Sequence, residues 1–136
     1  MTKRLPFDDE SFDIIYHPVS NVYGENVYHI FKECYRILKK NGILVCGLDN
    51  GINFITNDEN KIENKLPFNP LKNQEQMDLL LKEDSGVQFS HTLEEQIGGQ
   101  LKAGFILTDL YEDTNGYGRL HELNIPTFIA TRAIKK

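Results

Sequence analysis

A chain of 136 residues with 40% hydrophobic and 26% charged residues has the size and composition of one soluble globular domain. Its net charge of −5 provides no basic field for a phosphate backbone, and it contains neither a signal-peptide pattern nor an apolar run long enough to span a membrane. We therefore expect a cytoplasmic protein whose primary partner is neither a nucleic acid nor a membrane. Cys34 and Cys46 fall inside apolar patterns, which predicts buried thiols, and no metal-ligand spacing occurs.

The first part of the chain predicts a strand, a helix and a second strand. Residues 12–16 (FDIIY) form a short apolar run typical of a strand in a parallel sheet. Residues 26–40 carry apolar side chains at three- and four-residue spacing, which predicts an amphipathic helix capped by Asn41 and Gly42. Residues 43–48 (ILVCGL) predict the second strand. This order forms a crossover between parallel strands and indicates an α/β fold with helices packed on the sheet.

Residues 49–91 interrupt this pattern. They are polar and rich in asparagine, and their one short amphipathic stretch is at residues 74–82 (QEQMDLLLK). A segment of about forty residues without a strand is too long for an ordinary connection. We expect a lid-like insertion with its own short helix, inside a single domain that spans residues 1–136. A flexible loop is the alternative interpretation.

Regular structure resumes at Thr92, which forms a capping box with Glu95 and predicts the start of a helix that ends before Gly104. Three apolar residues would form one face of this helix: Leu93, Ile97 and Leu101.

Two glycines lie inside the same predicted helix. Gly98 and Gly99 weaken it, and we expect close packing of the backbone on the sheet to compensate. Residues 105–111 and 127–134 then predict two antiparallel strands, joined by a polar loop at residues 112–126 without a helical pattern.

Two blocks of the sequence resemble the class I S-adenosylmethionine-dependent methyltransferase family. LPFDDESFDIIYH at residues 5–17 is similar to the family's L-P-F-x-x-x-S-F-D signature, in which the LPF turn lies beside the adenine of the cofactor. ECYRILKKNGILVCG at residues 33–47 resembles the segment that closes the following helix and opens the next strand. The resemblance implies a partial Rossmann-like sheet, with strands equivalent to the family's strands 4, 5, 7 and 6, flanking helices and the long insertion.

The resemblance also implies that part of the family fold is missing. The family's sheet has the strand order 3-2-1-4-5-7-6, so strands 1, 2 and 3 would precede residue 1. The glycine-rich loop and the acidic residue that bind the cofactor belong to those strands. We therefore expect a truncated chain that binds S-adenosylmethionine weakly or not at all. The strand at residues 12–16 would become a sheet edge with unpaired backbone groups, which predicts a homodimer through this edge.

The candidate site residues follow from the same resemblance. The cofactor-side candidates are Leu5, Pro6 and Phe7 beside the adenine, and His17, Pro18 and Val19 near the methionine end. The substrate-side candidates are Asn21, Tyr23, Asp49 and Asn50.

His17 is also the candidate for a catalytic base, because a neutral imidazole can accept a proton near neutral pH. The structural alternatives are that His17 is hydrogen-bonded to the local turn and that Phe7 packs against the sheet edge. The sequence has no N-P-P-[YF] motif, so the chemistry of the substrate stays open.

Two functions are compatible with these observations. The first is an S-adenosylmethionine-dependent methyltransferase that acts on a small molecule, with this chain equivalent to the C-terminal part of the family fold. The alternative is a catalytically inactive α/β module that forms a homodimer through its exposed strand edge.

Overall fold

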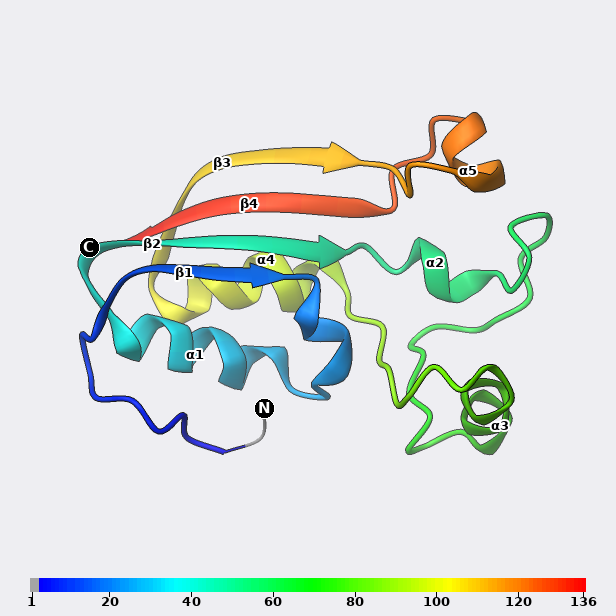
Figure 1. The fold of residues 1–136 in the computed structure, drawn as a ribbon, viewed down its shortest axis with the longest axis horizontal. Coiled ribbons are helices and arrows are strands. Elements are labelled where there is room, and N and C mark those ends of the chain that lie inside the picture. Colours follow the sequence, from blue (N-terminus) through cyan, green and yellow to red (C-terminus); the bar gives the residue numbers. More distant parts are fainter. Residues whose placement is uncertain (1–2) are drawn as a thin grey trace.

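The computed structural model describes residues 3–136, which form a four-stranded sheet with helices packed against it (Figure 1). The strands are β1 (Phe12–Pro18), β2 (Leu38–Asp49), β3 (Phe105–Asp113) and β4 (Phe128–Lys135). Their order in the sheet is β1-β2-β4-β3. β1 and β2 are parallel, whereas β4 is antiparallel to both of its neighbours. The α/β class, the strand order and the antiparallel closing pair are as predicted.

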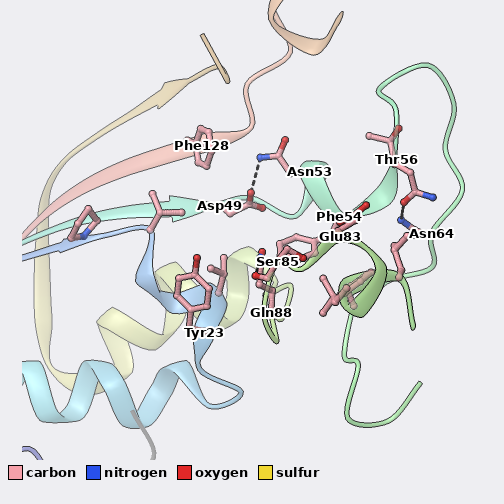
Figure 2. A pocket seen from close by; sticks show the side chains of 17 residues that line it. Tyr23, Asp49, Asn53, Phe54, Thr56, Asn64, Glu83, Ser85, Gln88 and Phe128 are labelled. Carbon is pink, nitrogen blue, oxygen red and sulfur yellow. Dashed lines mark hydrogen bonds between the residues drawn. The ribbon is translucent and has the colours of Figure 1, made fainter. Parts of the chain in front are cut away.

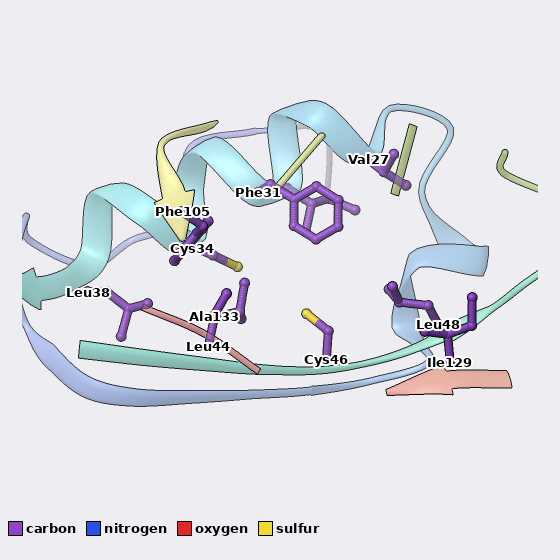
Figure 3. Packing of buried hydrophobic residues seen from close by; sticks show 11 residues of the cluster. Val27, Phe31, Cys34, Leu38, Leu44, Cys46, Leu48, Phe105, Ile129 and Ala133 are labelled. Atoms are coloured by element: carbon purple, nitrogen blue, oxygen red, sulfur yellow. The ribbon is translucent and has the colours of Figure 1, made fainter. Parts of the chain in front are cut away.

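The hydrophobic core lies between the sheet and two helices, α1 (Val27–Ile37) and α4 (Leu93–Ala103), which cover the same face (Figure 1). Figure 3 shows how side chains from α1 meet those from β2 and β4, Phe31 and Leu44 among them. Cys34 and Cys46 belong to this core as free thiols, and burial raises the pKa of Cys34 to about 12. The prediction of buried thiols is confirmed.

The opposite face of the sheet is uncovered in the part of the chain that the structure describes (Figure 1). Successive side chains of a strand point to opposite faces, so the residues that alternate with the core positions lie on this open face. β1 is the edge strand, and its Ile14 and Tyr16 side chains are 61% and 72% exposed. The structure therefore agrees with the expected edge position of this strand, although only one of its faces is open.

α1 ends earlier than the spacing predicts. The expected helix runs to residue 40, but Leu38 already has an extended backbone with ψ of 139° and pairs with Phe12 in the sheet. Asn41 does adopt the predicted left-handed conformation, with φ of 65°. It lies within an irregularity of the β1–β2 pairing, however, and does not cap the helix. Leu38, whose apolar spacing is that of a helix, therefore belongs to a strand because it pairs with Phe12.

The start and end of α4 are as predicted, but its buried face is not. Thr92 and Glu95 form the capping box, and Gly104, with φ of 108°, ends the helix. Leu93 and Leu101 are exposed, and the helix buries Gln96, Gly99 and Gln100 in their place.

Hydrogen bonds explain this reversal. The Gln96 side chain donates to the Asp49 carbonyl oxygen at 2.6 Å, and the Thr131 hydroxyl donates to Gln100 Oε1 at 3.1 Å. Buried amides with partners of this kind carry little desolvation cost.

Of the two glycines of α4, Gly99 allows a close approach, but to a helix and not to the sheet. A Cβ on Gly99 would lie 3.0 Å from Cδ2 of Phe31 in α1. The predicted packing of this pair on the sheet is therefore wrong, because α4 lies against α1 at this point.

The segments between the main elements contain short helices. The insertion holds α2 (Ile52–Ile55) and α3 (Gln74–Glu83), the second of which matches the predicted short helix. α5 (Gly118–Glu122) lies in the loop that was expected to lack one, and the turn η1 (Ser20–Tyr23) follows β1. α5 is too short to produce a periodic pattern, and its Leu120 N–H donates to Glu59 Oε2 at 3.0 Å. Of the helices described, none is both long and apolar enough to cross a bilayer.

Candidate functional site

A cavity of about 520 Å³ lies beside the carboxyl ends of the parallel strands β1 and β2 (Figure 2). Its walls come from the loop after β1, the end of β2 and the insertion, with Phe128 from the start of β4. In open α/β sheets, ligands bind outside the carboxyl ends of the strands. The volume is in the range of small-molecule sites.

The cavity wall beside β1 is held in place by the backbone conformation of Val19. Val19 has a left-handed conformation with φ of 49°, and its N–H donates to the Gly47 carbonyl oxygen at 2.8 Å. A Cβ on Gly47 would lie 3.1 Å from Cγ2 of Val19 and 3.3 Å from its nitrogen. The glycine in β2 therefore lets the Pro18–Val19 turn fold tightly over the end of the sheet.

Asp49, at the end of β2, is the buried acid of the cavity. Its Oδ1 accepts from the Gly51 N–H at 2.7 Å, and its Oδ2 accepts from the Asn53 amide at 2.7 Å. Burial nevertheless raises the pKa of this carboxyl group, because removal from water disfavours its charged form. The two hydrogen bonds act in the other direction and orient the carboxylate at the cavity wall.

The insertion is held against the β1 side by hydrogen bonds and apolar contacts. The Phe89 N–H donates to the Val22 carbonyl oxygen at 2.7 Å. The Phe68 N–H donates to Ser90 Oγ at 2.7 Å, and the Phe68 ring lies 5.2 Å from that of Phe54. Leu80 of α3 is also buried and lines the cavity. The insertion thus forms an ordered wall of the cavity.

Four of the residues predicted from the sequence line this cavity. They are Pro18 and Val19 from the cofactor-side set, and Tyr23 and Asp49 from the substrate-side set. Tyr23 is exposed, and Figure 2 shows it on the side opposite Asn53. The structure therefore brings residues of both predicted sets to one cavity.

His17 and Asn21 lie in the interior and do not line the cavity. His17 Nε2 and Asn21 Oδ1 are 2.6 Å apart, and burial lowers the pKa of the imidazole. His91 Nε2 lies 3.1 Å from the Asn21 carbonyl oxygen. This geometry matches the structural alternative for His17, a histidine bonded to the local turn, and its role as a base stays a prediction.

The other predicted residues lie elsewhere. Leu5, Pro6 and Phe7 run alongside α1, where the Leu5 N–H donates to Glu33 Oε2 at 2.7 Å. The Phe7 ring makes an edge contact with Phe12 at 5.0 Å between centroids, in line with the packing alternative. Asn50 donates through its side chain to the Pro126 carbonyl oxygen at 2.8 Å. None of these residues lines the cavity, so their ligand roles stay predictions.

Sequence reasoning missed most of the cavity wall. Apart from Val22 of η1, the residues not predicted individually come from the insertion and from β4, and they include Asn53, Phe54, Phe68, Glu83, Ser85, Gln88 and Phe128. The signal that could have found part of this wall is the apolar stretch of residues 77–81, which needs a surface to cover. Among the described residues, no group of three or more His, Cys, Asp and Glu side chains could hold a metal ion.

Comparisons with known proteins agree with this geometry. Residues 1–46 match the family model of a methyltransferase domain. The chain is 40% identical over 137 aligned positions to the uncharacterized methyltransferase YbaJ of Bacillus subtilis, and the match covers 95% of this chain and 53% of that protein. The chain thus spans about half the length of this curated relative.

Solved methyltransferases share the fold. An S-adenosylmethionine-dependent methyltransferase from Mesorhizobium loti superposes with a TM-score of 0.73 at 16% identity, over 96% of this chain and 65% of that one. A putative enzyme of the same class from Listeria monocytogenes gives 0.66 at 17% identity, over 97% and 65%. Together these matches show that the chain is homologous to YbaJ and contains one part of the fold of S-adenosylmethionine-dependent methyltransferases.

Proposed function

We propose that this chain forms the substrate-binding part of an S-adenosylmethionine-dependent methyltransferase that acts on a small molecule. The observation that carries the proposal is the cavity beside Pro18 and Val19, at the carboxyl end of a parallel strand and enclosed on its other side by the insertion. In this arrangement the cavity holds the methyl acceptor, and the insertion serves as a lid.

The cofactor supplies an activated methyl group. When bound, it would supply this group to a nucleophilic atom of the acceptor held in the cavity. Such a transfer depends mainly on proximity and alignment. The residues of this chain would therefore act by holding the acceptor in line and by excluding water, and the cavity wall does not need a catalytic triad.

The described residues fit only one side of the cofactor. Pro18 and Val19 offer a turn at the end of β1, and the free edge of β1 lies beside them. Within residues 3–136, no strand is followed by a glycine-rich loop of the phosphate- or nucleotide-binding kind. We therefore propose that the chain by itself binds the cofactor weakly or not at all.

Calorimetric titration of S-adenosylmethionine into two samples tests this proposal. The first is the chain alone, for which we expect no saturable heat. The second is the chain co-expressed with the part of B. subtilis YbaJ that it does not match, for which we expect binding with a Kd on the order of micromolar.

Failure of the co-expressed pair to bind the cofactor, although the two polypeptides copurify, contradicts the methyltransferase proposal. Tight binding by the chain alone contradicts the proposed incomplete site and points to a second copy that completes it.

A second candidate function rests on the exposed edge. We propose that the chain forms a homodimer through β1, because Ile14 and Tyr16 leave an apolar surface on a strand whose backbone is paired on one side only. In this case the chain is an α/β module without catalytic activity. Its test is the mass of the protein in solution.

A further inference from the structure

The charges that line the cavity all have one sign. Two carboxylates, Asp49 and Glu83, belong to the wall, and among the described residues the wall contains no lysine, arginine or histidine. The remaining polar groups are amides and hydroxyls, which can adapt to either charge. An anionic ligand would find no charged partner here, whereas a cation would find two.

Of the two acids, Asp49 is the better placed to bind a cation in the cavity. It is 7% exposed, and both of its oxygens are fixed by the bonds to Gly51 and Asn53. No basic side chain accompanies it in the wall to offset the cost of burying its charge. A positively charged ligand in the cavity would supply this missing partner.

The last turn of α3 adds to the negative field. Leu79, Leu80 and Glu83 of this helix line the cavity, so its carboxyl-terminal turns border the ligand space. The carboxyl end of a helix carries a partial negative charge and favours cations. Ser85, just beyond the helix, has a buried Oγ without a hydrogen-bond partner among the described residues. This hydroxyl is free to accept a hydrogen bond from a ligand.

Aromatic rings complete the wall. They come from four separate segments of the chain and are Tyr23, Phe54, Phe68 and Phe128. Figure 2 shows Tyr23, Phe54 and Phe128 around the same space as Asp49. Aromatic faces attract cations and also pack against apolar groups. A ligand that combines an apolar body with one positive charge would therefore contact both the aromatic rings and the carboxylates of the wall.

We propose that the cavity selects a small organic amine, bound in its ammonium form against Asp49 and Glu83 with its apolar part among the aromatic rings. Aliphatic amines are protonated at neutral pH, as the lysine side chain is. This inference rests on the proposed function, since it names the class of the methyl acceptor. Before transfer, the ammonium nitrogen would pass one proton to the Asp49 carboxylate, because its lone pair must be free to accept the methyl group.

Three probes of similar size and different charge test the inference: phenethylamine, phenethyl alcohol and hydrocinnamate. Each is titrated into the isotope-labelled chain, and the amide shifts are followed by NMR. We expect phenethylamine to bind about fivefold more tightly than the alcohol, and hydrocinnamate to bind least, from a screened charge interaction and a cation–π contact. The shifts should lie at Tyr23, Ser85 and Gln88, which line the cavity.

Two variants of α3 separate the cavity acid from surface charge. Glu83→Gln removes a charge from the cavity wall, and Glu75→Gln removes one from the exposed first turn of the same helix. We expect Glu83→Gln to weaken phenethylamine binding about threefold and Glu75→Gln to leave it unchanged. Both positions are exposed, so neither change should affect folding, and thermal unfolding checks this.

Equal affinity for the amine and the alcohol, shifts outside the cavity, or no binding of any probe would overturn the amine inference. So would an unchanged affinity in Glu83→Gln. The measurement uses no cofactor and no methyl transfer, so its failure leaves the methyltransferase proposal to its own test. Failure of the cofactor titration, in turn, leaves the measured ligand preference of the cavity intact.

Discussion

Arg36 and Glu33 tie the N-terminal segment to α1. The guanidinium group donates to Glu33 Oε2 at 2.8 Å, to the Phe7 carbonyl oxygen at 2.8 Å and to the Leu5 carbonyl oxygen at 3.2 Å. The Glu33 and Arg36 side chains are 11% and 18% exposed, and the Leu5 N–H donates to the same carboxylate. The bond from Arg36 lowers the pKa of Glu33 to about 2.

This pKa predicts a loss of stability in acid. The ordinary value is 4.5, so the contribution of ionised Glu33 is present above pH 4.5 and is lost as the pH falls toward 2. We expect Glu33→Gln to lower the free energy of unfolding at neutral pH by about 1–2 kcal/mol, because water screens part of this charge interaction. Its unfolding free energy should also fall less steeply with acid than that of the unmodified chain. Chemical denaturation at several pH values measures both effects.

Glu94→Gln is the control, because Glu94 is an exposed residue of α4 that takes no part in the pairing of Glu33 with Arg36. Parallel acid profiles for Glu33→Gln and the unmodified chain would contradict the assignment of this effect to Glu33.

Individual side chains were the hardest features to predict. The LPF residues form part of a real motif, yet they lie along α1 because the backbone bonds to Glu33 and Arg36 hold them there. Gln96 looks like a surface residue in the sequence, but its partners Asp49 and Asn21 lie in distant segments. Local spacing cannot reveal such partners, and they decide which side of a helix is buried.

At the level of elements, the adjacent glycines of α4 form a matched pair. A Cβ on Gly98 would meet only Cγ of Glu94 at 3.8 Å, an ordinary contact. A Cβ on Gly99 would lie 3.0 Å from Cδ2 and 3.3 Å from Cε2 of the fully buried Phe31. Position 98 thus has room for a methyl group. A methyl group at position 99 would push Phe31, and with it α1, away from α4.

We expect opposite effects from alanine at these two positions. Gly98→Ala should stabilise the fold by about 0.5–1 kcal/mol, because alanine loses less conformational freedom in a helix. Gly99→Ala should destabilise it by roughly 1–3 kcal/mol, the usual cost of overpacking a core. Denaturant unfolding of the two variants measures the difference. Equal stabilisation by both changes would show that the α1–α4 contact is looser than described.

Element types were predictable where several local signals agreed. The capping box and Gly104 set both ends of α4, and the apolar run of β1 set that strand. The end of α1 was missed because pairing between Leu38 and Phe12 depends on a strand from elsewhere in the chain. α5 was missed because five residues give no periodicity, and contacts with the insertion hold it.

For the whole molecule, the open face of the sheet is the dominant exposed feature. In addition to Ile14 and Tyr16, the exposed apolar residues that alternate with core positions include Ile106 and Tyr111 of β3. All belong to strands of one sheet, and the free edge of β1 borders the same face. These residues lie toward the two edges of the sheet, and apolar patches on an exposed surface mark sites that bind another polypeptide.

The proposed homodimer predicts a mass of twice 15.7 kDa in solution. Tyr16→Lys should shift the chain toward the monomer, because a lysine on an edge strand opposes pairing. Tyr117→Lys is the control, since Tyr117 is 81% exposed in a loop outside the sheet. Light scattering over a wide concentration range gives the mass of each. A monomer at every concentration, for the unmodified chain, would refute the homodimer.

The position of the candidate site was predictable, but its composition was only partly so. The carboxyl ends of β1 and β2 could be located because a strand–helix–strand order fixes a parallel pair. Tyr23 and Asp49 follow directly from that location. The wall from the insertion was not predictable, because contacts such as that between Phe89 and Val22 determine where this polar segment packs.

The position of β4 has a consequence for how the protein is made. β4 is the last strand of this chain, yet it lies inside the sheet between β2 and β3. While the chain is being synthesised, the edges of β2 and β3 that pair with β4 stay unpaired until residues 128–135 have been made. The sheet therefore closes only after residues 128–135 have been made, and a nascent chain that stalls before β4 exposes strand edges to aggregation and to chaperones.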